Sequence, residues 1–184
     1  MKKTYLLILA ILAFSQMKAQ LIKEKSIDLS IGRGISTPYD DIEIYGYGFY
    51  LQGEYVLTIA SWIDIRPYAG VILTKSIDNK REPSEYRSNA RAFLIGGKTR
   101  LKAPIPWVAP YIEIGIGASV GSFETITPWT YIEESGLLMH MPLSIGLELG
   151  PKHNFDVALT YYFHDSVQQF AGAFAVGFSI PLNN

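Results

Sequence analysis

The last strand-length segment of the chain, from Phe170 to Leu182, alternates between two kinds of side chain. One parity carries alanine, glycine and serine. The other parity is large and apolar, broken only by Gly172, and consists of Phe170, Phe174, Val176, Phe178, Ile180 and Leu182. Because successive side chains of a β-strand point to opposite faces, this pattern predicts a strand with one apolar face and one small, polar-tolerant face.

The same alternation recurs along the rest of the chain. Eight segments show it, over residues 26–34, 48–59, 63–73, 91–101, 111–120, 137–148, 155–164 and 170–182. The links 35–47, 74–90 and 122–135 are long, whereas 60–61, 102–107, 150–154 and 165–169 are short. Alternating strands with long links at one end are typical of a transmembrane β-barrel. We therefore expect an all-β, single-domain, eight-stranded antiparallel up-and-down barrel with three long outer loops.

Prolines interrupt this pattern. Pro67 and Pro110 lie near the beginnings of two predicted strands, where a missing ladder donor is tolerated. Pro142 lies well inside the predicted strand 137–148 and therefore predicts either a bulge or a shifted strand boundary.

The amino terminus has the pattern of an export signal. Lys2 and Lys3 precede an apolar run over residues 5–14, and Ala19 offers a small residue at a cleavage site. We expect a signal peptide over residues 1–19 and a barrel domain over residues 20–184. The run is shorter than the roughly 20 residues that a spanning helix needs. Only helices and closed barrels satisfy all backbone groups in lipid, so the expected location is the outer membrane of a Gram-negative bacterium.

The composition excludes several kinds of site and partner. The chain has no cysteine, which excludes disulfides and cysteine-based metal sites. A formal net charge of −1 without a basic block argues against nucleic acid. His140 and His153 have no partner at a metal-ligand spacing, so we expect no metal and no cofactor.

A soluble periplasmic barrel of the lipocalin-like, ligand-binding kind is the structural alternative, because it also has eight alternating strands. The polar face here is rich in glycine, which suits a narrow, filled interior better than a solvated exterior. Aromatic residues gather near both strand ends, as interfacial girdles do, and these are Tyr45, Tyr47, Phe49 and Tyr50 at one end and Trp62 and Trp107 at the other. Both features favour the membrane barrel.

Charged residues recur on the parity that is predicted to face inward. They include Asp28, Glu54, Asp64, Arg66, Lys98, Arg100, Glu113, Glu148 and Asp156. We expect a lumenal ion-pair network that contains Glu113, Lys98, Arg100, Glu54, Arg66 and Asp64. A turn centred near Ile105 places Glu113 opposite Lys98 or Arg100. An eight-stranded barrel has room for such side chains and little else, so a diffusion channel is not expected.

With these features the chain resembles the small eight-stranded outer-membrane barrels of the OmpA transmembrane-domain and OmpX type. The resemblance covers essentially all of the mature chain, although Phe178 is its last aromatic residue. It implies a non-enzymatic role in outer-membrane integrity or in surface contact through the loops. The implied partners are outer-membrane lipids, lipopolysaccharide and the outer-membrane assembly machinery. Residues of the second outer loop that offer charge to lipopolysaccharide phosphates are Lys75, Lys80, Arg81 and Arg87.

The segment Phe163-His164-Asp165-Ser166 resembles the His-x-Ser motif of the lipid A deacylase family, which is also built on an eight-stranded barrel. This resemblance implies Ser166 as the nucleophile on a lipid A ester and His164 as its base. The chain departs from that family at Val167, where asparagine is usual, and it lacks an acidic residue on the last strand. Alternation also places His164 on the lumenal face. Lipid A ester hydrolysis is therefore the alternative to a non-enzymatic role.

Overall fold

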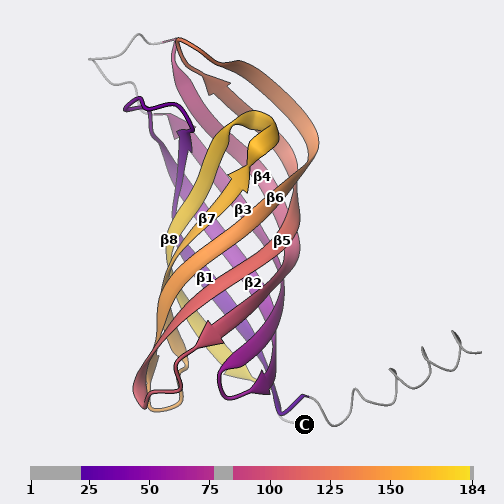
Figure 1. Cartoon of the computed structure of the whole chain (residues 1–184), viewed down its shortest axis with the longest axis vertical. Helices are drawn as coiled ribbons and strands as arrows, with labels where there is room; N and C mark the ends of the chain where they lie inside the picture. The colour runs from indigo at the N-terminus through magenta and orange to yellow at the C-terminus, as the bar shows by residue number, and fades with distance from the viewer. Residues whose placement is uncertain (1–21, 77–84, 183–184) are drawn as a thin grey trace, which may run out of the picture.

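Eight antiparallel strands close into a single barrel in the computed structural model, which describes residues 22–76 and 85–182 (Figure 1). The strands are β1 (Glu24–Pro38), β2 (Gly46–Ala60), β3 (Ile63–Ser76), β4 (Arg87–Lys102), β5 (Trp107–Ile126), β6 (Tyr131–Gly150), β7 (Phe155–His164) and β8 (Gln169–Pro181). Each strand pairs with its neighbours in sequence, and β8 closes the barrel on β1. The predicted fold class is confirmed. The expected signal peptide, residues 1–19, lies outside the described residues.

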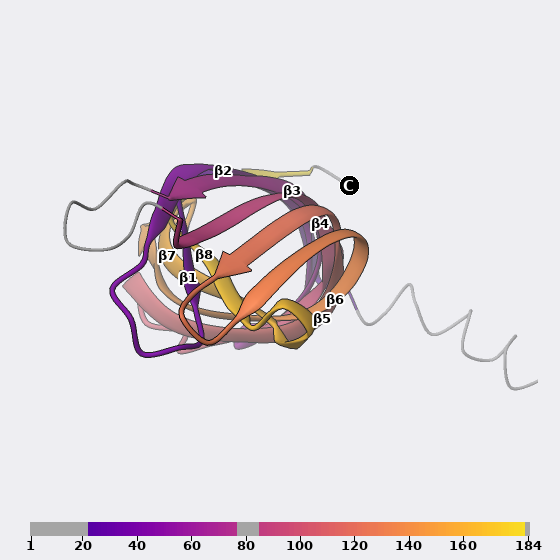
Figure 2. The ribbon, with the colours of Figure 1, turned by 90° about the horizontal axis from the view of Figure 1, so that it is seen from above.

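The two faces of β8 separate as the alternation predicts. Phe174, Val176 and Phe178 are between 43% and 54% exposed on the outside, whereas Ala171, Ala173 and Ala175 are at most 5% exposed. The other strands follow the same rule for large exposed side chains, so apolar residues surround the barrel. Polar side chains, together with a buried apolar cluster that includes Ile72, Leu94 and Phe123, face the bore that Figure 2 shows from above. This arrangement is the reverse of a soluble ligand-binding barrel, in which the apolar face lines the interior.

The aromatic residues near the strand ends are mostly where the girdle prediction places them. Trp62 and Trp107 are exposed at the end of the barrel that carries the short turns, and Tyr45 and Phe49 are exposed toward the other end. Tyr50 is an exception, because it is only 2% exposed and points into the bore. Its even number in β2 gives it the same parity as the inward-facing Gln52 and Glu54, so its inclusion in the girdle was wrong.

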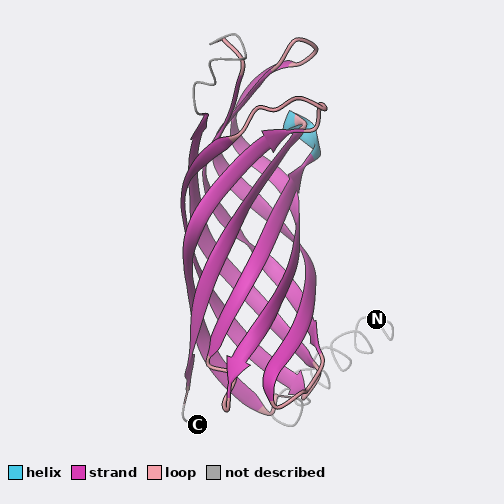
Figure 3. Ribbon diagram, turned by 90° about the vertical axis from the view of Figure 1, so that its left-hand side faces the viewer, coloured by secondary structure: helices cyan, strands magenta, loops and turns pink. Residues whose placement is uncertain are grey.

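The prediction of a long third outer loop was wrong as well. β5 continues to Ile126 and β6 begins at Tyr131, so the link predicted over 122–135 shrinks to a tight turn, closed by the Thr127 amide donating to the Thr130 carbonyl at 2.8 Å. β-branched and aromatic residues around this turn favour strand. The result is a β5–β6 hairpin that, together with the start of β4 beside it, extends beyond the turn between β7 and β8 (Figures 1 and 3). The first outer link is also shorter than predicted, because β1 ends at Pro38 and β2 begins at Gly46.

The prolines interrupt pairing without shifting it. Ile114 pairs with Leu143 and Gly117 pairs with His140 in one continuous register, and only the pairs around Pro142 are missing from the ladder. Neither a bulge nor a strand boundary therefore lies at Pro142, contrary to the prediction. The register shift that does occur lies between Thr58 and Ala60, where β2 meets β3.

Candidate functional site

A network of buried charges fills the lower half of the bore, toward the end with the short turns. Glu113 on β5 lies directly opposite Arg100 on β4. Its Oε1 accepts from Arg100 Nε at 2.7 Å, and its Oε2 accepts from Lys98 Nζ at 2.7 Å. Arg66 Nε lies 3.6 Å from the same carboxylate, which is 1% exposed. Three cations from two strands thus converge on one buried carboxylate.

The network extends around the barrel from this centre. Arg66 also binds Asp28 and donates from Nε to Glu54 at 2.5 Å, and Lys98 bridges back to Glu54 at 2.6 Å. On the other side, Arg100 Nη1 donates to Glu148 Oε1 at 2.8 Å. Arg100 also stacks over the Tyr111 ring, 3.6 Å from its centroid. All of these charges are held by partners on other strands, so the network ties the barrel wall together across the bore.

Lys102 joins this network although the sequence placed it in a turn. Its Nζ lies 3.0 Å from Asp64 Oδ2 and 3.3 Å from Glu148 Oε2. β4 continues to Lys102, one residue beyond its predicted end. Lys102 shares the even parity of Lys98 and Arg100, and that parity was the signal that could have identified it. Asp64, predicted as a network member, is fully buried and has Lys102 as its cation.

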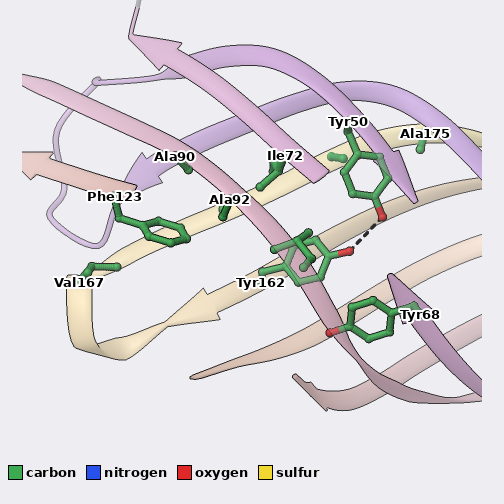
Figure 4. Close-up of a cluster of buried hydrophobic side chains, with 12 residues drawn as sticks. Tyr50, Tyr68, Ile72, Ala90, Ala92, Phe123, Tyr162, Val167 and Ala175 are labelled. Atoms are coloured by element: carbon green, nitrogen blue, oxygen red, sulfur yellow. Dashed lines mark hydrogen bonds between the residues drawn. The ribbon is translucent and has the colours of Figure 1, made fainter. Parts of the chain in front are cut away.

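Aromatic and amide side chains fill the bore above the charges. The hydroxyls of Tyr50 and Tyr162 lie 2.9 Å apart, as the dashed line in Figure 4 marks, with Tyr68 beside them. Tyr162 donates to Gln52 Oε1 at 2.6 Å, and Gln52 donates in turn to Glu54 at 2.7 Å. The uncharged layer is therefore joined by hydrogen bonds to the charged layer below it.

Two histidines and a serine continue this layer upward as a directed chain of hydrogen bonds. His164 Nδ1 lies 3.1 Å from the Tyr162 carbonyl, which only accepts, so Nδ1 carries the proton and Nε2 accepts from Ser119 Oγ at 2.8 Å. Ser119 then accepts from His140 Nδ1 at 2.7 Å, and His140 Nε2 accepts from the Tyr68 hydroxyl at 2.5 Å. Every member is satisfied when both imidazoles are neutral. Ser119, which joins the two histidines, was not identified from the sequence.

The turn between β7 and β8 covers the outer mouth of the bore. It consists of the single 3₁₀ turn η1 (Asp165–Val167), whose Val167 is fully buried. The Val167 carbonyl accepts from Thr125 Oγ1 at 2.8 Å, and the Gln169 amide donates to Ser88 Oγ at 2.7 Å. η1 and β8 therefore meet β4 and β5 across the outer mouth and close that end of the bore.

The structure does not bring His164 and Ser166 together as a nucleophile and its base. His164 is fully buried, and both of its ring nitrogens are occupied by Ser119 and the Tyr162 carbonyl. Ser166 lies exposed on η1, at the edge of an outer groove lined by apolar residues that include Ile116, Met139 and Phe163. Within residues 22–76 and 85–182, no hydrogen bond joins the two side chains.

The inner mouth holds a small polar cavity of about 150 Å³, lined in part by Asp28, Asp64, Glu148 and Asp156. Each of these carboxylates has at least one oxygen without a hydrogen-bond partner among the described residues. No group of three or more histidine, aspartate or glutamate residues in that part of the chain has an arrangement that holds a metal ion. No helix there is long and apolar enough to cross a bilayer.

The fold and the filled lumen together define a small eight-stranded barrel of the outer-membrane type. Solved structures of this type resemble the chain: Neisserial surface protein A aligns at a TM-score of 0.57 with 12% identity, over 86% of this chain and 97% of that one. The outer membrane protein OprG from Pseudomonas aeruginosa aligns at a TM-score of 0.50 with 7% identity, over 86% and 97% of the two chains. The likeness at such low identity is one of fold.

The structure of an outer-membrane enzyme also aligns. The outer membrane enzyme PagL matches at a TM-score of 0.49 with 14% identity, over 84% of this chain and 99% of that one. No protein-family model matches the chain, and no curated protein matches its sequence. The resemblance to small outer-membrane barrels that the strand pattern predicted is confirmed at the level of the fold.

Proposed function

We propose that this protein is a closed, non-enzymatic barrel of a Gram-negative outer membrane, and that its working surface is the outer rim. The observation that carries the proposal is the contrast between a bore filled by side chains through its middle and outer mouth and a β5–β6 hairpin that projects beyond that mouth. A packed bore leaves no route for a solute. What remains for function is the lipid-facing wall, which supports membrane integrity, and the rim, which supports contact with other molecules.

Lipids and lipopolysaccharide are the partners that the outer wall supports. The wall is a continuous apolar belt, and exposed cations lie beyond it on β1, β3 and β4. Arg33 stacks on Tyr47 at 4.5 Å, Tyr47 pairs with Lys75, and Arg91 lies one strand further on, opposite Leu73. Cations at this height suit phosphate groups at the membrane surface. Outer-membrane assembly machinery that recognises the last strand would contact the apolar face of β8.

A packed lumen predicts that the protein does not conduct ions. Purified protein inserted into planar bilayers is expected to show no more current than bilayers without protein, because the ion-pair network and the η1 turn occupy the bore. A large open porin in the same bilayers serves as the positive control. Stable single-channel steps from the folded protein would contradict the closed lumen and with it the proposal.

Lipid A hydrolysis is the alternative function, and it has a direct test. We expect mass spectrometry of lipid A to give the same acyl pattern in outer membranes with the parent protein, with Ser166→Ala and with neither. The expectation rests on the occupied nitrogens of His164, which leave Ser166 without a base. Loss of an acyl chain with the parent but not with Ser166→Ala would establish the esterase instead.

A further inference from the structure

β6 is much longer than the strand beside it. β6 and β7 pair only from Met141 with Phe163 to Leu149 with Phe155, although β6 begins at Tyr131. The segment Tyr131–His140, named here the β6 edge, pairs with β5 on one side. On the other side of the β6 edge, β7 ends at His164 and the chain turns back into β8 through η1. The barrel wall therefore has a notch above β7, bounded by an open strand edge.

The backbone groups that face the notch can be identified from the register. The Thr127 amide donates to the Thr130 carbonyl, so residues 127 and 130 form a hydrogen-bonded pair. Such pairs alternate along an antiparallel ladder, so even-numbered residues of the β6 edge bond to β5 and odd-numbered ones point into the notch. The latter are Tyr131, Glu133, Ser135, Leu137 and Met139. Among residues 22–76 and 85–182, no hydrogen bond reaches their backbone groups.

Open strand edges are usually protected in natural proteins. Proline, lysine, bulges or a covering segment serve this purpose, because unpaired amides and carbonyls form a template for another strand. The β6 edge contains neither proline nor lysine. It also carries large side chains that are well exposed, including Tyr131 and Leu137. This edge has the properties of one that accepts a strand.

A second copy of the chain is a poor occupant. Two β6 edges that pair antiparallel are related by a two-fold axis perpendicular to the sheet. That axis would turn one barrel upside down, whereas copies in one membrane share one orientation. The strands are also tilted against the barrel axis (Figure 1), which prevents two upright copies from aligning their edges in parallel. A second copy is therefore excluded, and an extended segment of a different molecule is the occupant that the open edge suits.

The charges around the notch indicate what that segment carries. Glu134 is exposed on the mouth-facing side of the β6 edge, and Asp165 is exposed at the base of the notch on η1. Asp165 accepts from the Tyr39 hydroxyl at 3.0 Å, and burial raises the pKa of that hydroxyl to about 12, so the bond persists at neutral pH. Glu133 is held on the outward side by Arg87 at 2.9 Å. No cation within the described chain pairs with Glu134 or Asp165.

We propose that the β6 edge binds an extended, basic peptide segment of another protein by strand addition. Main-chain hydrogen bonds to the odd-numbered residues would supply affinity, and lysine or arginine on alternate positions would face Glu134 on the mouth side. A cation at a position of the other parity would face Asp165, which lies on the outer face. The proposal rests on the proposed role of the rim in surface contact and names the chemistry of its partner.

The test uses the full protein in phosphatidylcholine nanodiscs and a fluorescent peptide of alternating lysine and threonine, Lys-Thr-Lys-Thr-Lys-Thr-Lys. Its control is the same peptide N-methylated on every residue, which keeps every charge and leaves no backbone donor on either edge. We expect fluorescence anisotropy to show saturable binding of the first peptide and binding weaker by about tenfold or more for the second. Hydrogen exchange should slow at residues 131–135, the part of the β6 edge that lies beyond the apolar belt, only with the first peptide.

Two matched variants locate the site. Ser135→Pro removes a notch-facing amide without touching the ladder to β5, and it should weaken binding by about tenfold, whereas Ser135→Ala should leave binding unchanged. Retained heat-modifiable migration shows that each variant folds. Equal binding of both peptides would show that charge attraction alone holds the peptide. Binding of neither peptide would show that the β6 edge is not a peptide-binding site. Either result would overturn strand addition. Neither result bears on the conductance and lipid A experiments, which test the closed, non-enzymatic barrel separately.

Discussion

Glu113→Gln is expected to lower the free energy of unfolding in detergent by about 3 to 5 kcal/mol. The substitution keeps the shape of the side chain and removes the charge on which Lys98, Arg100 and Arg66 converge. Those cations are buried, so they cannot recover the lost interaction from water. Because the network is shielded from solvent, the loss should persist at high salt. Urea titrations of the refolded protein, followed by tryptophan fluorescence and by migration of unboiled samples, measure the change.

The rim offers a matched control for this substitution. Glu133 also pairs with an arginine, but both side chains are about 40% exposed, so Glu133→Gln should cost less than about 1 kcal/mol. Adding Lys98→Met to Glu113→Gln should restore part of the stability, because it removes one of the uncompensated cations. An unchanged unfolding midpoint for Glu113→Gln would show that the network fills the bore without stabilising it.

The inward and outward faces were the most predictable part of the structure. Strand alternation is a local property, so Ile114 and Phe178 could be assigned to the wall, and Glu113 and His164 to the bore, from parity alone. The contact between Glu113 and Arg100 could be predicted once the short turn between β4 and β5 was placed. Predictions that depend on parity or on a short link required no knowledge of the rest of the barrel.

Strand ends and contacts across the bore were not predictable in the same way. The alternation continues through Phe123 and Thr125, but the polar residues around them resembled a loop, and this hid the extension of β5 and β6. Ser119 meets His164 from a strand that is not its neighbour, and the stagger of three strands sets that contact. The His164–Ser166 hypothesis relied on closeness in sequence, whereas opposite faces of the wall separate the two side chains.

Ile114→Arg is expected to make folding into a bilayer less favourable by about 2 to 4 kcal/mol, because it places a charge near the middle of the apolar belt. Ile114 is 58% exposed on the outward face of β5, with Ile112 and Ile116 on either side of it along that face. In a barrel surrounded by water, the same substitution would put a charge on a solvated surface and cost little. The experiment therefore separates the membrane barrel from a soluble one as well as measuring the belt.

Ser135→Arg is the control, since Ser135 lies opposite Ser122 on the neighbouring strand β6, exposed on the outward face beyond the belt, where an arginine costs about 0 to 1 kcal/mol. Folding of both variants into phosphatidylcholine vesicles, titrated with urea, gives the two free energies. A difference close to zero would mean that Ile114 does not contact lipid. A large loss for Ile114→Arg alone would show that the apolar parity, which first distinguishes this sequence, is the surface that the bilayer covers.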